Sequence, residues 1–242
     1  MALSLLVIAV PAYAGPPFVT DDPETVDYRH VEIDAFTEGT QSNNALTGTA
    51  AGLDANYGLY PNVQLSLITP LVFNAVDEKT PAYGYGDTQF AVKYRFVNED
   101  EDNGGWQVAI YPQVNIPTGN ANRSLGTGQV AEFLPVYVEK DFDPWQIYGG
   151  SGYWNNPGIG NRNYWFFGGV VQRKITDYLT LGGEFFHQTA NTIVGRDSSG
   201  MNIGGTYDFN ENYHLLFSTG SGILDSADNN VYSYYLAFQM TY

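Results

Sequence analysis

Cysteine is absent from the 242-residue chain, and basic residues are few. Ten Lys and Arg stand against 26 Asp and Glu, which gives a formal net charge of -16. Because the chain has no basic surface to replace phosphate counterions, its composition argues against nucleic acid as a partner. The lack of cysteine is compatible with an oxidising compartment in which the fold needs no disulfides.

Long hydrophobic runs are also missing, since no stretch after the first residues reaches the roughly 18 apolar residues that a transmembrane helix needs. Residues 1–14 carry an apolar core followed by the small-x-small pattern Ala12-Tyr13-Ala14. This pattern predicts a secretory signal peptide over residues 1–14, with Gly15 as the first mature residue. The usual basic leader is lacking, because the first basic residue is Arg29. If the mature chain crosses a membrane, we expect it to do so with strands.

Glycine and tyrosine are abundant, with 27 and 19 copies, and this suits many short strands with aromatic girdles. The clearest strand is the last one, residues 231–242, where every second side chain is large and apolar or aromatic. That row is Tyr232, Tyr234, Leu236, Phe238, Met240 and Tyr242. A strand with one apolar face and a terminal aromatic is typical of bacterial outer-membrane barrels, although a soluble sandwich could end in the same way. We expect Phe238, Met240 and Tyr242 to form the assembly signal for the barrel assembly machinery.

About twelve alternating runs follow one another from Tyr28 onward, most clearly at residues 88–96 and 106–116. Short connections alternate with generally longer, glycine-rich ones, and both chain ends fall on the short side. Greek-key sandwiches need crossing connections that would break this order. The sequence therefore predicts an all-β, transmembrane, antiparallel up-and-down β-barrel of about 12 strands over residues 28–242, with periplasmic termini.

Residues 15–27 hold three prolines and four acids, so neither a helix nor a central strand is expected there. We interpret them as an extended N-terminal arm. The sequence leaves two places open for this arm, the periplasm or the inside of the barrel.

Several segments also resemble a known family. They are GPPFVTDDPETVDY, YGYGDTQFAVKYRF, NIPTGNANRSLGTG, GYWNNPGIGNRNYWFFGG, GGEFFHQTA and GGTYDFNENYHLLFSTG. Over the whole mature chain they resemble the outer-membrane transporter family labelled as a MetA pathway of phenol degradation. The resemblance implies an outer-membrane barrel that passes small, aromatic or apolar compounds. The label describes a pathway association and not a mechanism.

Polar side chains on the inner face are the candidate solute pathway, because charges there must line water or pair with one another. These candidates are Glu32, Asp34, Asp54, Gln89, Lys93, Arg95, Gln113, Asn115, Lys174 and Glu184. The acids gather on the first two predicted strands, and Lys93 with Arg95 on the fourth. We expect either a field across the pore that favours weakly anionic or polar aromatic solutes, or pairing with wall carboxylates that closes the lumen.

Four isolated basic residues stand in predicted long loops: Lys79, Arg123, Arg162 and Arg196. On the outer leaflet they could bind lipopolysaccharide phosphates, in addition to the surrounding lipid, or they could form salt bridges between loops.

Enzymatic chemistry has little support in the sequence. Only three histidines occur, and no nearby carboxylate on the same face orients His187. No nucleotide-binding loop, zinc spacing or calcium loop is present, so we expect neither a cofactor nor a metal. The sequence favours a passive channel for small solutes. Its alternatives are a closed barrel that acts through its extracellular loops and an outer-membrane hydrolase.

Overall fold

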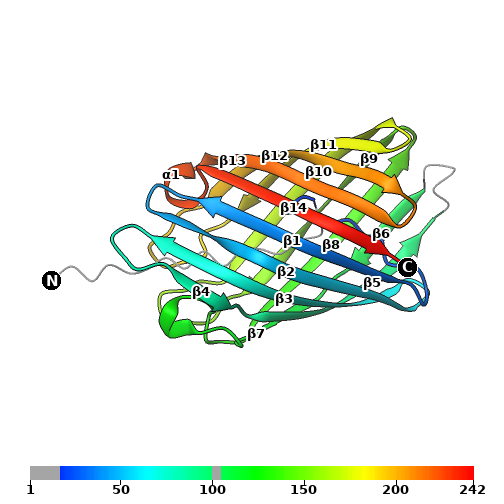
Figure 1. The fold of residues 1–242 in the computed structure, drawn as a ribbon. Coiled ribbons are helices and arrows are strands. Elements are labelled where there is room, and N and C mark those ends of the chain that lie inside the picture. Colours follow the sequence, from blue (N-terminus) through cyan, green and yellow to red (C-terminus); the bar gives the residue numbers. More distant parts are fainter. Residues whose placement is uncertain (1–16, 100–104) are drawn as a thin grey trace.

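The computed structural model describes residues 17–99 and 105–242, so the predicted signal peptide over residues 1–14 lies outside the described residues. The described chain forms one antiparallel sheet that closes on itself (Figure 1). Its strands are β1 (Val31–Gln41), β2 (Ala45–Tyr60), β3 (Val63–Val76), β4 (Ala82–Tyr85), β5 (Thr88–Asn98), β6 (Trp106–Ile110), β7 (Gln113–Ile116), β8 (Ala131–Phe142), β9 (Trp145–Asn155), β10 (Tyr164–Thr176), β11 (Leu179–Gln188), β12 (Ser198–Asn210), β13 (Tyr213–Leu224) and β14 (Tyr232–Thr241).

Two positions in the wall are each shared by two consecutive strands, β4 with β5 and β6 with β7. β6 and β7 pair with the same two neighbours, β5 and β8, on either side of Tyr111 and Pro112. β3 likewise pairs with β5 through its first half and with β4 through its second half. The wall therefore has twelve antiparallel positions, and β1 pairs with β14 to close it. The prediction of an up-and-down barrel of about 12 strands is confirmed.

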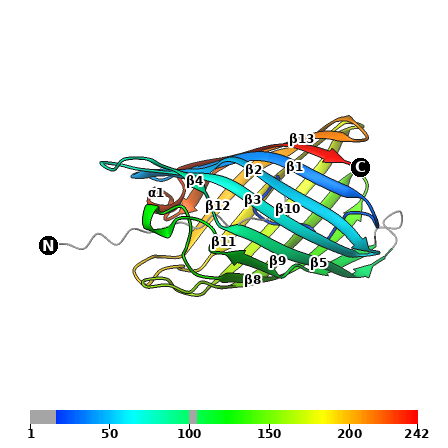
Figure 2. The ribbon, with the colours of Figure 1, turned by 60° about the horizontal axis from the view of Figure 1, so that its bottom comes forward.

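The two ends of the barrel differ in their connections. The turns β2–β3, β8–β9, β10–β11 and β12–β13 are tight and lie at the same end as Tyr242, which we call the short-turn end. The opposite end, the loop end, carries α1 (Ser226–Asn229), the 3-10 turn Ala121–Arg123 and the longer connections (Figures 1 and 2). None of the described helices is long and apolar enough to cross a membrane.

The outside of the barrel wall is apolar, whereas its inside combines polar side chains with buried aromatic and aliphatic ones. In β5, Phe90 and Val92 are 52% and 41% exposed, whereas their neighbours Gln89 and Lys93 are 2% and 5% exposed. β14 alternates in the same way, with Leu236 and Phe238 exposed and Ala237 buried. A wall whose exposed face is apolar is stable only against lipid, and closure leaves no backbone groups unpaired there. The chain is an outer-membrane β-barrel.

Candidate functional site

The N-terminal arm runs through the inside of the barrel. Phe18, Thr20 and Asp21 are 3%, 0% and 3% exposed, and their contacts reach β5, β9, β10 and β11. At the short-turn end the arm joins the wall, where the Arg29 amide donates to the Gly58 carbonyl at 2.7 Å. Of the two places that the sequence left open for the arm, the described residues occupy the lumen.

Glu184 on β11 binds the arm at Val19 and Thr20. Its carboxylate accepts hydrogen bonds from the Thr20 amide and hydroxyl, both at 2.6 Å, and from the Val19 amide at 3.1 Å. Asn202 of β12 donates a further bond at 2.6 Å. A buried carboxylate needs such donors, and hydrogen bonds to a charged acceptor are the stronger kind. Glu184 therefore serves as a fixed anchor for the arm.

Lys93 on β5 holds the middle of the arm. Its ammonium group lies 3.1 Å from Asp21 Oδ1, 3.7 Å from Asp22 Oδ1 and 3.1 Å from the Asp22 carbonyl oxygen. It also lies 4.8 Å from the centre of the Tyr111 ring. The carboxylates that form salt bridges with Lys93 therefore belong to the arm.

Arg95 has a different environment from Lys93. Its guanidinium donates to Asn62 Oδ1 at 3.1 Å and to Gln107 Oε1 at 2.6 Å. Asn62 belongs to the β2–β3 turn, so Arg95 lies near the short-turn end. Of the two basic residues expected on the inner face, Lys93 forms salt bridges with the arm and Arg95 is bonded to neutral amides, so the expected pairing with wall carboxylates is not what holds them.

The remaining inner-face candidates lie on several parts of the wall. Gln89 donates to Asn115 at 2.9 Å, and Gln113 is 2% exposed. The acids of β1 and β2 are neighbours, because Asp34 and Asp54 are directly paired in the register and Glu32 stands opposite Asn56. Lys174 instead lies at the short-turn end with an exposed side chain, 3.6 Å from Asp177.

The loop half of the barrel contains a vestibule with a cavity volume of about 180 Å³. Its walls combine aromatic, acidic and amide side chains, among them Phe36, Phe166, Phe186, Tyr234, Tyr235, Glu38, Asp54, Gln188, Asn191 and Asn202. Pro17, Phe18 and Val19 of the arm also line it. Pockets for drug-sized molecules typically measure about 300–1,000 Å³, so the vestibule suits only a solute smaller than these.

A protein family described as "Putative MetA-pathway of phenol degradation" matches residues 17–240. The chain belongs to this family. The match begins inside the arm and ends in β14, so it spans both the arm and the barrel wall.

Solved structures show the same fold at low identity. The COG4313 outer membrane channel from Pseudomonas putida F1 has a TM-score of 0.73 and 13% identity, over 91% of this chain and 98% of that one. The KdgM porin has a TM-score of 0.61 and 10% identity, over 87% and 99%. The NanC porin has a TM-score of 0.57 and 11% identity, over 86% and 98%. A comparison with curated proteins finds no match.

In this family member, His187 is the histidine closest to a hydroxyl. Its Nδ1 atom lies 2.9 Å from Ser199 Oγ, and its ring stacks on Phe167 of the outer wall. Within the described parts of the chain, no carboxylate is hydrogen-bonded to this ring. A nucleophile and base without an orienting group do not make the triad of a hydrolase.

The arm residues Thr20, Asp21 and Asp22 are site residues that inspection of the sequence did not single out. Two signals pointed toward them: the arm is rich in acids, and Lys93 with Arg95 had no carboxylate within reach on adjacent strands. A buried cation requires a compensating anion, so an acidic segment able to enter the lumen was a candidate partner.

Proposed function

We propose that this chain is a passive outer-membrane channel for small solutes, and that it favours uncharged molecules with an aromatic or apolar part. The observation that carries the proposal is the vestibule of the loop half, which is lined by wall residues and by Pro17, Phe18 and Val19 of the arm. A barrel closed for purely structural reasons would gain stability by filling this space with side chains.

The lining of the vestibule supports the proposed solute class. The half-buried Phe186 ring offers a stacking surface, while Gln188 and Asn202 offer hydrogen bonds that fix orientation. Acidic polymers suit this wall poorly, because its charged members are carboxylates and Lys93 is already paired with the arm. The KdgM porin, which is known in a complex with disordered oligogalacturonate, shares the fold, and this lining favours a different solute here.

Single-channel recording in a planar bilayer tests the proposal. The purified chain should give discrete conductance steps, and adding a neutral aromatic alcohol should cause brief interruptions of the current. A sugar alcohol of similar mass should cause far fewer, because it lacks an aromatic face to stack in the vestibule. Replacing Phe186 by Ala should shorten the interruptions without abolishing conductance.

A chain that is folded by heat-modifiability but never conducts would contradict the channel proposal. That result would favour the closed barrel acting through its loops. Equal interruption by the aromatic alcohol and the sugar alcohol would keep the channel but remove the proposed solute class.

A further inference from the structure

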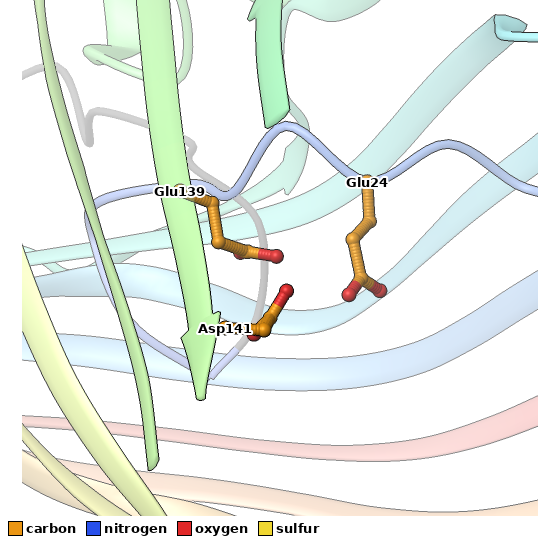
Figure 3. Close-up of side chains that lie close together, drawn as sticks. All are labelled: Glu24, Glu139 and Asp141. Atoms are coloured by element: carbon orange, nitrogen blue, oxygen red, sulfur yellow. The ribbon is translucent and has the colours of Figure 1, made fainter. Parts of the chain in front are cut away.

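Three carboxylates from two distant parts of the chain converge at the short-turn end of the barrel (Figure 3). Glu139 and Asp141 lie on β8, and Glu24 lies on the arm. One oxygen atom from each lies within 4.8 Å of the other two. Like charges this close repel unless a proton or a cation lies between them.

Glu139 provides a second, independent indication of a ligand. The residue is fully buried, at 0% exposure, and its Oε2 atom has no hydrogen-bond partner. Buried polar atoms in folded proteins are nearly always satisfied, so an orphaned carboxylate oxygen marks a place where a partner belongs. Figure 3 shows the Glu139 carboxyl group directed toward those of Asp141 and Glu24.

The surrounding amides hold these carboxylates in place without neutralising them. Gln107 donates to Glu139 Oε1 at 3.0 Å and to Asp141 Oδ2 at 3.3 Å, and Gln146 donates to Glu24 Oε1 at 3.3 Å. Gln107 is itself fixed by Arg95, which donates to its Oε1 atom. The cluster is therefore positioned from several strands.

We propose that Glu24, Glu139 and Asp141 bind a divalent cation of the calcium class, which fastens the arm to β8. The ligands are carboxylate oxygens alone, a set that suits hard cations and not the softer metals that prefer nitrogen or sulfur. Water completes the coordination, because Glu24 is exposed at the mouth of the barrel. The proposed cation site fastens the arm to the wall, so it does not depend on whether the barrel conducts.

No motif in the sequence indicates this site. Glu24 lies in a different segment from Glu139 and Asp141, and the Glu-x-Asp spacing on a strand matches no calcium loop. Only the entry of the arm into the lumen brings the three side chains together.

Equilibrium dialysis with radioactive calcium tests the proposal on the whole chain, refolded in detergent without lipopolysaccharide and freed of metal with a chelator. The parent should bind one Ca²⁺ per chain. Replacing Glu24 by Gln or Asp141 by Asn should weaken binding by about ten-fold or more, because each removes one charged ligand. The matched control is Glu132→Gln, since Glu132 lies on the same strand but bonds Asn155 near the loop end and should leave binding unchanged.

A change at buried Glu139 can prevent folding. The Glu24→Gln variant still tests the proposal in that case, because Glu24 is on the arm and not in the wall. No Ca²⁺ binding by the parent, or equal binding by parent and Glu24→Gln, would overturn the proposal. A cluster that takes up a shared proton in place of a cation would give the first of these results.

Discussion

A glycine at position 168 allows the arm to approach the wall. A methyl group at this position on β10 would collide with the Thr20 hydroxyl oxygen. That hydroxyl is committed to the Glu184 carboxylate at 2.6 Å, so it cannot turn away without losing a buried hydrogen bond. The next residue, Gly169, faces the opposite side of the wall, where the nearest atom to such a methyl group would be 4.0 Å away.

We therefore expect Gly168→Ala to weaken docking of the arm by about 1–3 kcal/mol, the usual cost of overpacking. Single-channel conductance should rise as the arm leaves the lumen more often. Gly169→Ala is the matched control and should conduct like the parent. If both variants behave alike, the arm does not limit the pore at Thr20.

At the residue scale, the sequence predicts which side of the wall a side chain lies on better than it predicts its partner. Alternation placed Gln89, Gln113 and Asn115 on the inner face, and all three are buried there. The partners of Glu184 could not be predicted, because the Thr20–Glu184 hydrogen bonds join residues 164 positions apart. Nothing local in either segment specifies such a contact.

β14 is the element that closes the barrel, since it joins β13 to β1. Its end is fixed by Tyr242, whose amide donates to the Val31 carbonyl at 2.8 Å and whose carbonyl accepts from the Val31 amide at 2.7 Å. The Tyr242 and Tyr213 hydroxyl groups lie 3.1 Å apart. The last residue is thus bonded to both neighbouring strands.

We propose that Phe238, Met240 and Tyr242 are read by the barrel assembly machinery. Deleting Tyr242 should sharply reduce the folded, heat-modifiable form in outer membranes. Tyr242→Phe keeps the aromatic ring and the backbone bonds, so it should assemble like the parent. Refolding of the deletion variant in detergent separates recognition from closure, because only the cell supplies the machinery. Normal assembly of the deletion variant in outer membranes would refute the proposal.

At the element scale, most strand positions could be predicted, but the short strand β4 and the facing of β8 could not. Both faces of β8 are apolar enough in sequence to meet lipid. In the structure Phe133 and Tyr137 point inward, and Leu134 and Val136 are exposed. Phe133 packs on Trp154 with ring centres 4.7 Å apart, so this side of the lumen is filled by aromatic rings. Period two identifies a strand, but it does not say which face meets lipid when both are apolar.

At the scale of the whole molecule, the ten basic residues fall into three groups. Lys93 and Arg95 lie inside the barrel. At the short-turn end, three of the four cations lie over aromatic rings of the rim: Arg29 over Tyr28, Lys140 over Trp106 and Arg173 over Trp145. The fourth, Lys174, pairs with Asp177. At the loop end, Lys79, Arg123, Arg162 and Arg196 are exposed.

In the described chain, the loop-end cations lack the aromatic and carboxylate partners that the cations of the short-turn end have. Within residues 17–99 and 105–242, none of Lys79, Arg123, Arg162 and Arg196 forms a salt bridge or lies over an aromatic ring. Salt bridges between loops, the alternative that the sequence left open, are therefore not formed by these side chains in the described chain. We propose that they bind phosphate groups of lipopolysaccharide, which an arginine can hold in bidentate fashion.

The prediction is that replacing all four loop-end cations by Gln lowers the amount of lipopolysaccharide that co-purifies with the barrel. The effect should be greatest at low ionic strength, because exposed charges are screened beyond about 10 Å in ordinary salt. The matched control replaces Arg29, Lys140, Arg173 and Lys174 by Gln. It removes the same charge from the short-turn end, which faces the periplasm, and should leave lipopolysaccharide unchanged. Equal loss in both variants would mean that net charge governs co-purification, and no loss in either would remove the proposal.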